Sequence, residues 1–172
     1  LMDEFDIEKS IIRISHEIIE NNRNLKDIAV VGIHNRGVPL ANRICKNIKQ
    51  LDGSSPNFGF LDITFHRDDF RKRLIVPEVK SSNIDFSVTD RKVILVDDVL
   101  YTGRTTRAAI EELSSFGRVA SIQLSVLIDR GHRELPIRAD YVGKNIPTHE
   151  GEHVKVLLKE IDGDDKVYLI KE

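Results

Sequence analysis

Hydrophobic and polar residues follow two patterns along the chain, one typical of helices and one typical of buried strands. Residues 6–22 have the helical pattern, with Asp6 as the predicted cap and isoleucines at three- and four-residue spacing: Ile7, Ile11, Ile14 and Ile18. Runs of mostly aliphatic residues at 28–31, 93–96 and 119–128 predict strands that are buried on both faces of a parallel sheet.

Further elements are predicted between and after these strands. A helix follows Gly37, with Pro39 in its first turn and an inward face that contains Leu40, Ala41, Ile44, Ile48 and Leu51. Another helix spans 105–116 and directs Ala109, Ile110 and Leu113 inward. Alternation at 61–65 predicts a strand with one apolar face, 84–88 a short strand, and 154–158 with 167–170 a closing hairpin. The order of elements predicts an α/β fold with a mainly parallel sheet flanked by helices.

Length and composition narrow the class of protein. A chain of 172 residues suits one domain, 1–172, and 40% hydrophobic with 31% charged residues is ordinary for a soluble protein. No apolar run reaches membrane-spanning length, and no secretory signal precedes the first helix. Cys45 is the only cysteine, which suits a reducing cytoplasm. A net charge of −2 means that any nucleic-acid binding must rest on a local basic patch.

Candidate chemistry follows the run at 93–96. Asp97 and Asp98 come at the predicted carboxyl end of that strand, where ligands of open α/β sheets bind. The next loop combines a glycine with hydroxyls at a helix start, in Thr102, Gly103, Arg104, Thr105 and Thr106. Such a loop can hold an anion while the carboxylates hold neighbouring sugar hydroxyls. The ligand implied is a phosphorylated sugar; the alternative is a solvated acid pair followed by a capping threonine.

A second loop, 32–37, has glycines at both ends and the sequence His34, Asn35 and Arg36 between Ile33 and Gly37. Its backbone donors and guanidinium can bind an oxyanion. Neither a Walker A sequence nor GxGxxG occurs, which argues against P-loop and dinucleotide-binding proteins. The charged segment 66–73 is either a solvated loop or a lid whose arginines, Arg67 and Arg71, close over a polyphosphate.

Taken together, the stretch from Val93 to Thr106 resembles the phosphoribosyl pyrophosphate (PRPP) signature of the type I phosphoribosyltransferases. The resemblance implies their fold, with a flexible lid loop and a small hood region beside the central sheet. It also implies Mg²⁺ held mainly through the substrate near Asp97 and Asp98, and catalysis by Asp97, Asp98, Arg36, Arg67 and Arg71. PRPP would be bound by the acid pair, by His34, Asn35, Arg36 and Gly37, and by the loop from Thr102 to Thr106.

The segment 129–148 resembles one branch of that family, whose members transfer the phosphoribosyl group to uracil and also attenuate transcription of pyrimidine operons. Resemblance implies a base pocket formed by Ile128, Asp129, Arg130 and Arg138. It implies RNA contacts from Arg13, His16, Arg133, Arg138 and Lys144, although Ile12 stands where that branch usually has a threonine. The implied partners are PRPP, uracil, UMP or UTP, leader mRNA and further copies of the chain in a homodimer or higher homo-oligomer.

Two alternatives remain open at the level of sequence. One is an RNA-binding regulator whose transferase site survives as a nucleotide sensor, and the other is a purine phosphoribosyltransferase. Nothing in composition or spacing distinguishes uracil from hypoxanthine, orotate or adenine.

Overall fold

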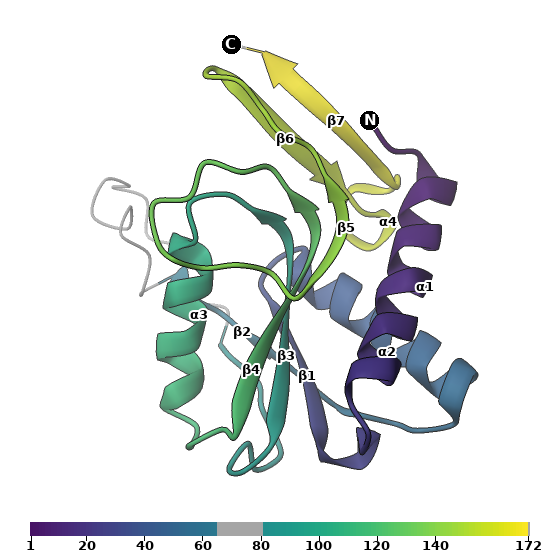
Figure 1. The fold of residues 1–172 in the computed structure, drawn as a ribbon, viewed down its shortest axis with the longest axis vertical. Helices are drawn as coiled ribbons and strands as arrows, with labels where there is room; N and C mark the ends of the chain where they lie inside the picture. Colours follow the sequence, from purple (N-terminus) through teal and green to yellow (C-terminus); the bar gives the residue numbers. More distant parts are fainter. Residues whose placement is uncertain (65–80, 172) are drawn as a thin grey trace.

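A computed structural model describes residues 1–64 and 81–171. Its centre is a five-stranded parallel sheet in the order β2-β1-β3-β4-β5 (Figure 1). The strands are β1 (Ile28–Ile33), β2 (Asn57–Leu61), β3 (Lys92–Leu100), β4 (Ser121–Asp129) and β5 (Tyr141–Asn145). Helices α1 (Glu4–Asn21) and α2 (Gly37–Asp52) cover one face, and α3 (Arg104–Ser114) covers the other. The predicted α/β fold with a parallel sheet flanked by helices is confirmed.

Both faces of the central strands are buried, as the aliphatic runs predicted. On β3, Ile94 and Val96 belong to the core beneath α1 and α2, whereas Val93 and Leu95 belong to the core beneath α3. β1 divides its residues in the same alternating way. Successive side chains of a strand point to opposite faces, so a strand between two helical layers needs apolar residues at every position.

The first helix begins earlier than predicted. Asp3 is its N-cap and accepts a hydrogen bond from the Asp6 amide at 2.9 Å, while the Asp6 side chain accepts one from the Asp3 amide at 3.3 Å. Asp6 therefore lies inside the first turn as the second half of a capping box. The predicted isoleucine stripe is confirmed, because Ile7, Ile11, Ile14 and Ile18 are all buried.

Several predictions of local structure are wrong. β2 ends at Leu61, so the strand predicted at 61–65 lies too late in the chain, and Phe65 is outside the described residues. Residues 84–88 form no strand; only Asn83 bridges Phe60. Ile110 is 39% exposed because it lies about 100° around the helix from the buried Ala109. Leu51, in the last turn of α2, is 44% exposed.

The predicted closing hairpin is confirmed. β6 (Glu152–Leu157) and β7 (Lys166–Lys171) pair antiparallel, and the short helix α4 (Lys159–Asp162) lies in their connection. The hairpin stands near the carboxyl ends of the parallel strands and beside the start of α1 (Figure 1). Met2 bridges Val167 of β7, which ties the first residues of the chain to the last strand. In the described ranges, no helix combines the length and apolar character that crossing a membrane requires.

Candidate active site

The two predicted anion-binding loops lie side by side at the carboxyl edge of the sheet. β1 and β3 pair in register, with Gly32 opposite Val96, so the turn at 34–36 and the loop at 101–103 leave neighbouring strands. Gly37 packs directly on β3, because a Cβ added there would lie 2.2 Å from the Val96 carbonyl oxygen and 3.3 Å from the Asp97 Cα. The first loop therefore touches the strand segment that carries the acid pair.

The acid pair lies within β3 rather than at its end. β4 continues to pair with β3 as far as Leu100, whereas the pairing with β1 stops at Val96. Asp97 and Asp98 therefore lie past the end of the β1 pairing, while β4 still runs beside them. Asp97 is buried and accepts the Asp98 amide at 2.9 Å; Asp98 is half-buried and accepts the Val99 amide at 2.9 Å. These backbone donors orient both carboxylates at the edge of the site.

The second loop owes its shape to Gly103, which has φ +92° and is the N-cap of α3. Thr102 accepts a bond from the Arg104 amide at 3.3 Å, and Thr106 is buried. A helix N-terminus presents amides without helical partners, and such amides can donate to an anion. The segment after β4 closes over it: the amides of Glu134 and Leu135 both donate to the Thr102 carbonyl, at 3.0 and 3.1 Å.

Arg36 has a partner that the sequence did not indicate. Its Nε and Nη2 donate to Asp162 of α4 at 3.2 and 2.7 Å. His34, two residues earlier, is fixed by its amide, which donates to the Leu61 carbonyl at 2.9 Å, and by an edge-on contact with Phe60. Asn35 is exposed between them. The loop therefore sits between the main sheet and the closing hairpin.

The four residues predicted to form the base pocket differ in how far they are exposed. The Ile128 side chain is fully buried in the core, so it does not line an open pocket. Arg130 is 6% exposed, donates to Thr148 at 3.1 Å and to the Glu152 carbonyl at 2.7 Å, and lies 3.9 Å from the centre of the Tyr101 ring. The Arg130 guanidinium is therefore held inside the protein rather than exposed to a ligand. Arg138 is exposed, and Asp129 is half-buried.

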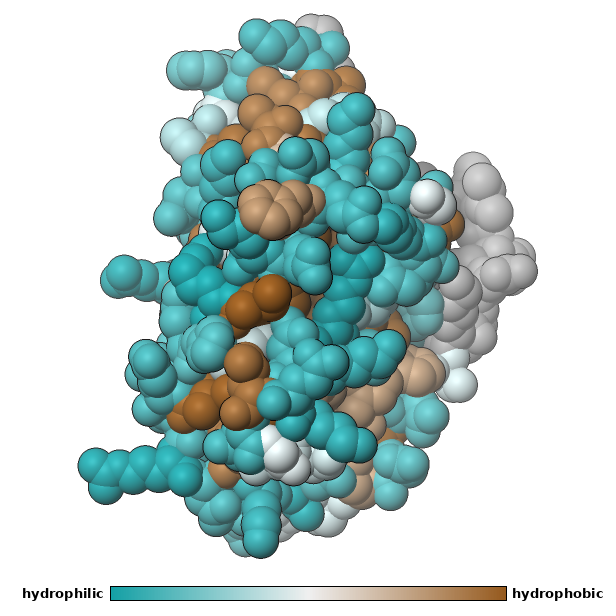
Figure 2. All heavy atoms as spheres, turned by 90° about the vertical axis from the view of Figure 1, so that its right-hand side faces the viewer, coloured by the Kyte–Doolittle hydropathy of each residue, from teal (hydrophilic) through white to brown (hydrophobic). Residues whose placement is uncertain are grey.

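The predicted RNA-binding residues fall into separate places. Arg13 and Lys144 lie together, where Arg13 donates to the Val142 carbonyl at 3.2 Å and Lys144 donates to the Leu1 carbonyl at 3.1 Å. Both line a shallow pocket of about 340 Å³. His16 is exposed one turn further along α1. The side of the molecule that carries α1 in Figure 1 faces the viewer in Figure 2, and its surface is largely hydrophilic with apolar groups between.

Arg133 does not belong to that surface. It forms an ion pair with Asp129 and donates to the Ile137 carbonyl at 2.9 Å and the Tyr101 carbonyl at 3.0 Å. Its guanidinium therefore joins the segment after β4 to Tyr101, the residue that precedes the Thr102–Thr106 loop. Arg138 precedes β5 and Lys144 lies near the other end of that strand, so they too form no compact patch. Arg67 and Arg71, the predicted lid arginines, lie outside the described residues.

A magnesium ion fits the donor set at the acid pair. Within residues 1–64 and 81–171, no group of three or more His, Cys, Asp or Glu side chains could hold a metal by itself. Mg²⁺ commonly binds one or two carboxylates together with substrate phosphates and water. Asp97 and Asp98 can supply those carboxylates.

The fold and the two loops at its carboxyl edge define a class of protein. The family model described as "Phosphoribosyl transferase domain" matches residues 3–161, and the chain therefore belongs to the phosphoribosyltransferase family. Within that family it groups with the PyrR proteins. A protein named "Bifunctional protein PyrR" from Clostridioides difficile strain 630 is 57% identical, with 97% of this chain and 94% of that protein covered.

Other comparisons agree. Proteins of the same name from Alkaliphilus metalliredigens and Deinococcus radiodurans are 56% and 52% identical, covering 98% and 95% of this chain and 93% and 90% of theirs. Among solved structures, a hypoxanthine phosphoribosyltransferase from Staphylococcus aureus has a TM-score of 0.69 at 24% identity, with 95% of this chain and 86% of that chain covered. At this low identity the structural match shows the fold alone.

Proposed function

We propose that the chain transfers the phosphoribosyl group of PRPP to uracil, which yields UMP and pyrophosphate, and that it also binds pyrimidine-operon leader mRNA. Binding controlled by UMP or UTP would attenuate transcription. The observation that carries the transferase is the convergence of the acid pair, the Thr102–Thr106 loop and the Arg36 turn on one edge of the sheet. The choice of uracil and the RNA activity rest on the membership in the PyrR group.

The reaction breaks the bond between the anomeric carbon and pyrophosphate and forms a bond from that carbon to a ring nitrogen, which loses its proton. Positive charge develops on the ribose and negative charge on the pyrophosphate, so the protein must stabilise both. Asp97 and Asp98 would hold the ribose hydroxyls and lend negative potential to the ring. Amides and hydroxyls of residues 102–106 would fix the 5′-phosphate and so position the reacting carbon.

Arg36 and the amides beside it would hold the departing pyrophosphate, and Arg67 and Arg71 would close over it. Bound Mg²⁺ would supply charge neutralisation on the phosphate oxygens. We further infer that the chain forms one transferase domain, acts in the cytoplasm and assembles as a homodimer or higher homo-oligomer.

Base selectivity tests the transferase proposal. Given PRPP and Mg²⁺ with uracil, hypoxanthine, guanine or orotate in turn, the protein is expected to form UMP with the highest kcat/KM. Product formation is measured by chromatography of the nucleotides. A preference for hypoxanthine or guanine would favour a purine phosphoribosyltransferase. Absence of turnover with every base, together with tight UMP binding, would favour a nucleotide-sensing regulator.

Replacing Lys144 with alanine tests the RNA proposal. Lys144 is exposed beside Arg13, and removing a phosphate contact is expected to weaken binding of leader RNA and reduce the salt dependence by about one unit of slope. Arg138→Ala should act in the same way, and uracil transfer by Lys144→Ala should be unchanged. Lys49→Ala removes an exposed lysine from α2 and is the control. Wild-type RNA affinity in all three variants would contradict the RNA proposal and leave only the transferase proposal.

A further inference from the structure

The arginine proposed to meet pyrophosphate is already bound to a carboxylate from the closing hairpin. Arg36 donates from Nη2 to Asp162 Oδ1 at 2.7 Å and from Nε to Oδ2 at 3.2 Å, a bidentate pair between residues 126 positions apart. The side chains are only 27% and 17% exposed. Such planar pairing fixes the orientation of the guanidinium as well as its position.

Asp162 is itself held in place. The Leu158 amide donates to Asp162 Oδ2 at 2.9 Å, and the Leu158 side chain is fully buried. The hydrogen bond from Arg36, followed by the one from Leu158, keeps the pKa of the Asp162 carboxyl below its usual range. Asp162 is therefore an ionised and oriented acceptor that is part of the folded hairpin connection.

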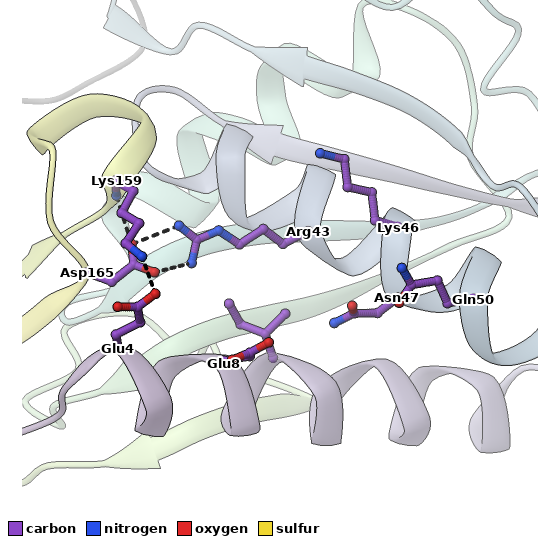
Figure 3. A pocket seen from close by; sticks show the side chains of 9 residues that line it. Glu4, Glu8, Arg43, Lys46, Asn47, Gln50, Lys159 and Asp165 are labelled. Atoms are coloured by element: carbon purple, nitrogen blue, oxygen red, sulfur yellow. Dashed lines mark hydrogen bonds and ion pairs between the residues drawn. The ribbon is translucent and has the colours of Figure 1, made fainter.

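Asp162 is not the sole residue that attaches the hairpin connection to α2 in the described part of the chain. Arg43, seven residues after Arg36 and therefore on nearly the same side of the helix, binds both Glu160 and Asp165. Figure 3 shows Arg43 directed at Asp165, between α1 and α2. The pKa of the Arg43 guanidinium is raised by these hydrogen bonds. The ion pairs of Arg43 thus anchor the connection between β6 and β7. The pair between Arg36 and Asp162 can therefore serve another role.

The pair leaves part of Arg36 open. A guanidinium has five N–H donors, and Asp162 accepts from Nε and from one hydrogen on Nη2. No other hydrogen bond of the Arg36 side chain is made within the described part of the chain. Arg36 also directly precedes Gly37, which packs on Val96 and Asp97, so its backbone position relative to the acid pair is fixed.

We propose that Asp162 is a positioning residue: it holds Arg36 by one edge so that the free N–H groups are presented to the pyrophosphate of PRPP. The inference rests on the proposed transferase function and deepens it, because it gives the closing hairpin a part in the site. Asp162 neutralises the charge of Arg36, so the contribution of Arg36 to pyrophosphate binding is mainly one of geometry.

Equilibrium binding of pyrophosphate with Mg²⁺ tests the proposal without requiring turnover. Asp162→Asn keeps an oxygen for the Leu158 amide but loses the ionised bidentate acceptor, and calorimetry is expected to show pyrophosphate binding about tenfold weaker. Binding of UMP, which has no pyrophosphate group, should be unchanged. The control is Glu160→Gln, which removes one carboxylate from Arg43 while Asp165 still holds it; neither affinity should change.

A double-mutant cycle separates positioning from hairpin attachment. If Asp162 acts through Arg36, then Asp162→Asn adds no further loss of pyrophosphate affinity in an Arg36→Ala background. A loss that persists in that background would overturn the proposal in favour of a structural role. Tighter pyrophosphate binding by Asp162→Asn would overturn it by showing that Asp162 competes with the ligand. A wild-type protein that neither binds pyrophosphate nor transfers uracil would instead contradict the proposed function, before any substitution is made.

Discussion

Replacing Asp98 with asparagine is expected to lower uracil transfer at least tenfold while the fold is retained. The amide is nearly isosteric, and its oxygen can still accept the Val99 amide that the carboxylate accepts at 2.9 Å. What is lost is the negative charge that we propose lies beside the ribose of PRPP, where positive charge would develop in the transition state. A tenfold loss corresponds to about 1.4 kcal/mol of barrier. Steady-state rates at saturating PRPP and uracil measure the effect, and the unfolding temperature checks the fold.

The control for this substitution is Asp90→Asn. Asp90 lies in the turn before β3, at the opposite end of the strand, and has φ +60°, which asparagine accepts. The substitution Asp90→Asn therefore removes one negative charge, as Asp98→Asn does, without touching the candidate active site. Wild-type turnover in the double variant Asp97→Asn with Asp98→Asn would show that the acid pair does not act in the reaction.

Gly37→Ala is expected to abolish pyrophosphate binding and to destabilise the protein. The new methyl group would meet the backbone carbonyl of Val96 at 2.2 Å, so either the 34–36 turn or β3 must move. Overpacking of this kind costs about 1–3 kcal/mol, and more where backbone must shift. Movement of the turn would displace Arg36, and movement of β3 would displace the acid pair. Calorimetry with Mg²⁺ and pyrophosphate, together with denaturant unfolding, measures both consequences.

Gly53→Ala, at the other end of α2, is the matched control. Nothing lies within 4 Å of its added methyl group, so only the strain of a residue at φ +79° is introduced. Moderate destabilisation with normal pyrophosphate binding is the expected result. Unchanged binding and unfolding in Gly37→Ala would mean that the turn does not pack on β3.

The features that were predictable from the sequence are those whose cause is local. The runs at 28–31 and 93–96 had to be interior strands, because aliphatic residues at every position suit only a sheet covered on both faces. The anion-binding loop could also be predicted from the sequence, because a glycine, three threonine hydroxyls and a predicted helix start occur together at 102–106. Both loops follow predicted parallel strands, so the sequence also predicts that they lie at the same edge of the sheet, where β1 and β3 are neighbours.

The features that escaped prediction depend on distant parts of the chain. Arg36 and Asp162 are 126 positions apart, and the only local signal was an acidic run between two predicted strands. The internal hydrogen bonds of Arg130 and Arg133 were not predicted, because a buried arginine and an exposed one look alike in sequence. Ile128 was assigned to a pocket wall, but its strand is buried on both faces.

The pairing of residues 1 and 2 with β7 also constrains the order in which parts of the protein can fold. The Leu1 amino group donates to the Val167 carbonyl across 166 positions, so this contact forms only after nearly the whole described chain has left the ribosome. Until then the start of α1, Arg36 and Arg43 lack their hairpin partners, while the parallel sheet already has its strands. Contacts so distant in sequence close late and slowly. Partly synthesised chains are thus expected to assemble a sheet that binds pyrophosphate more weakly than the complete protein, so pyrophosphate affinity reports whether the hairpin has folded.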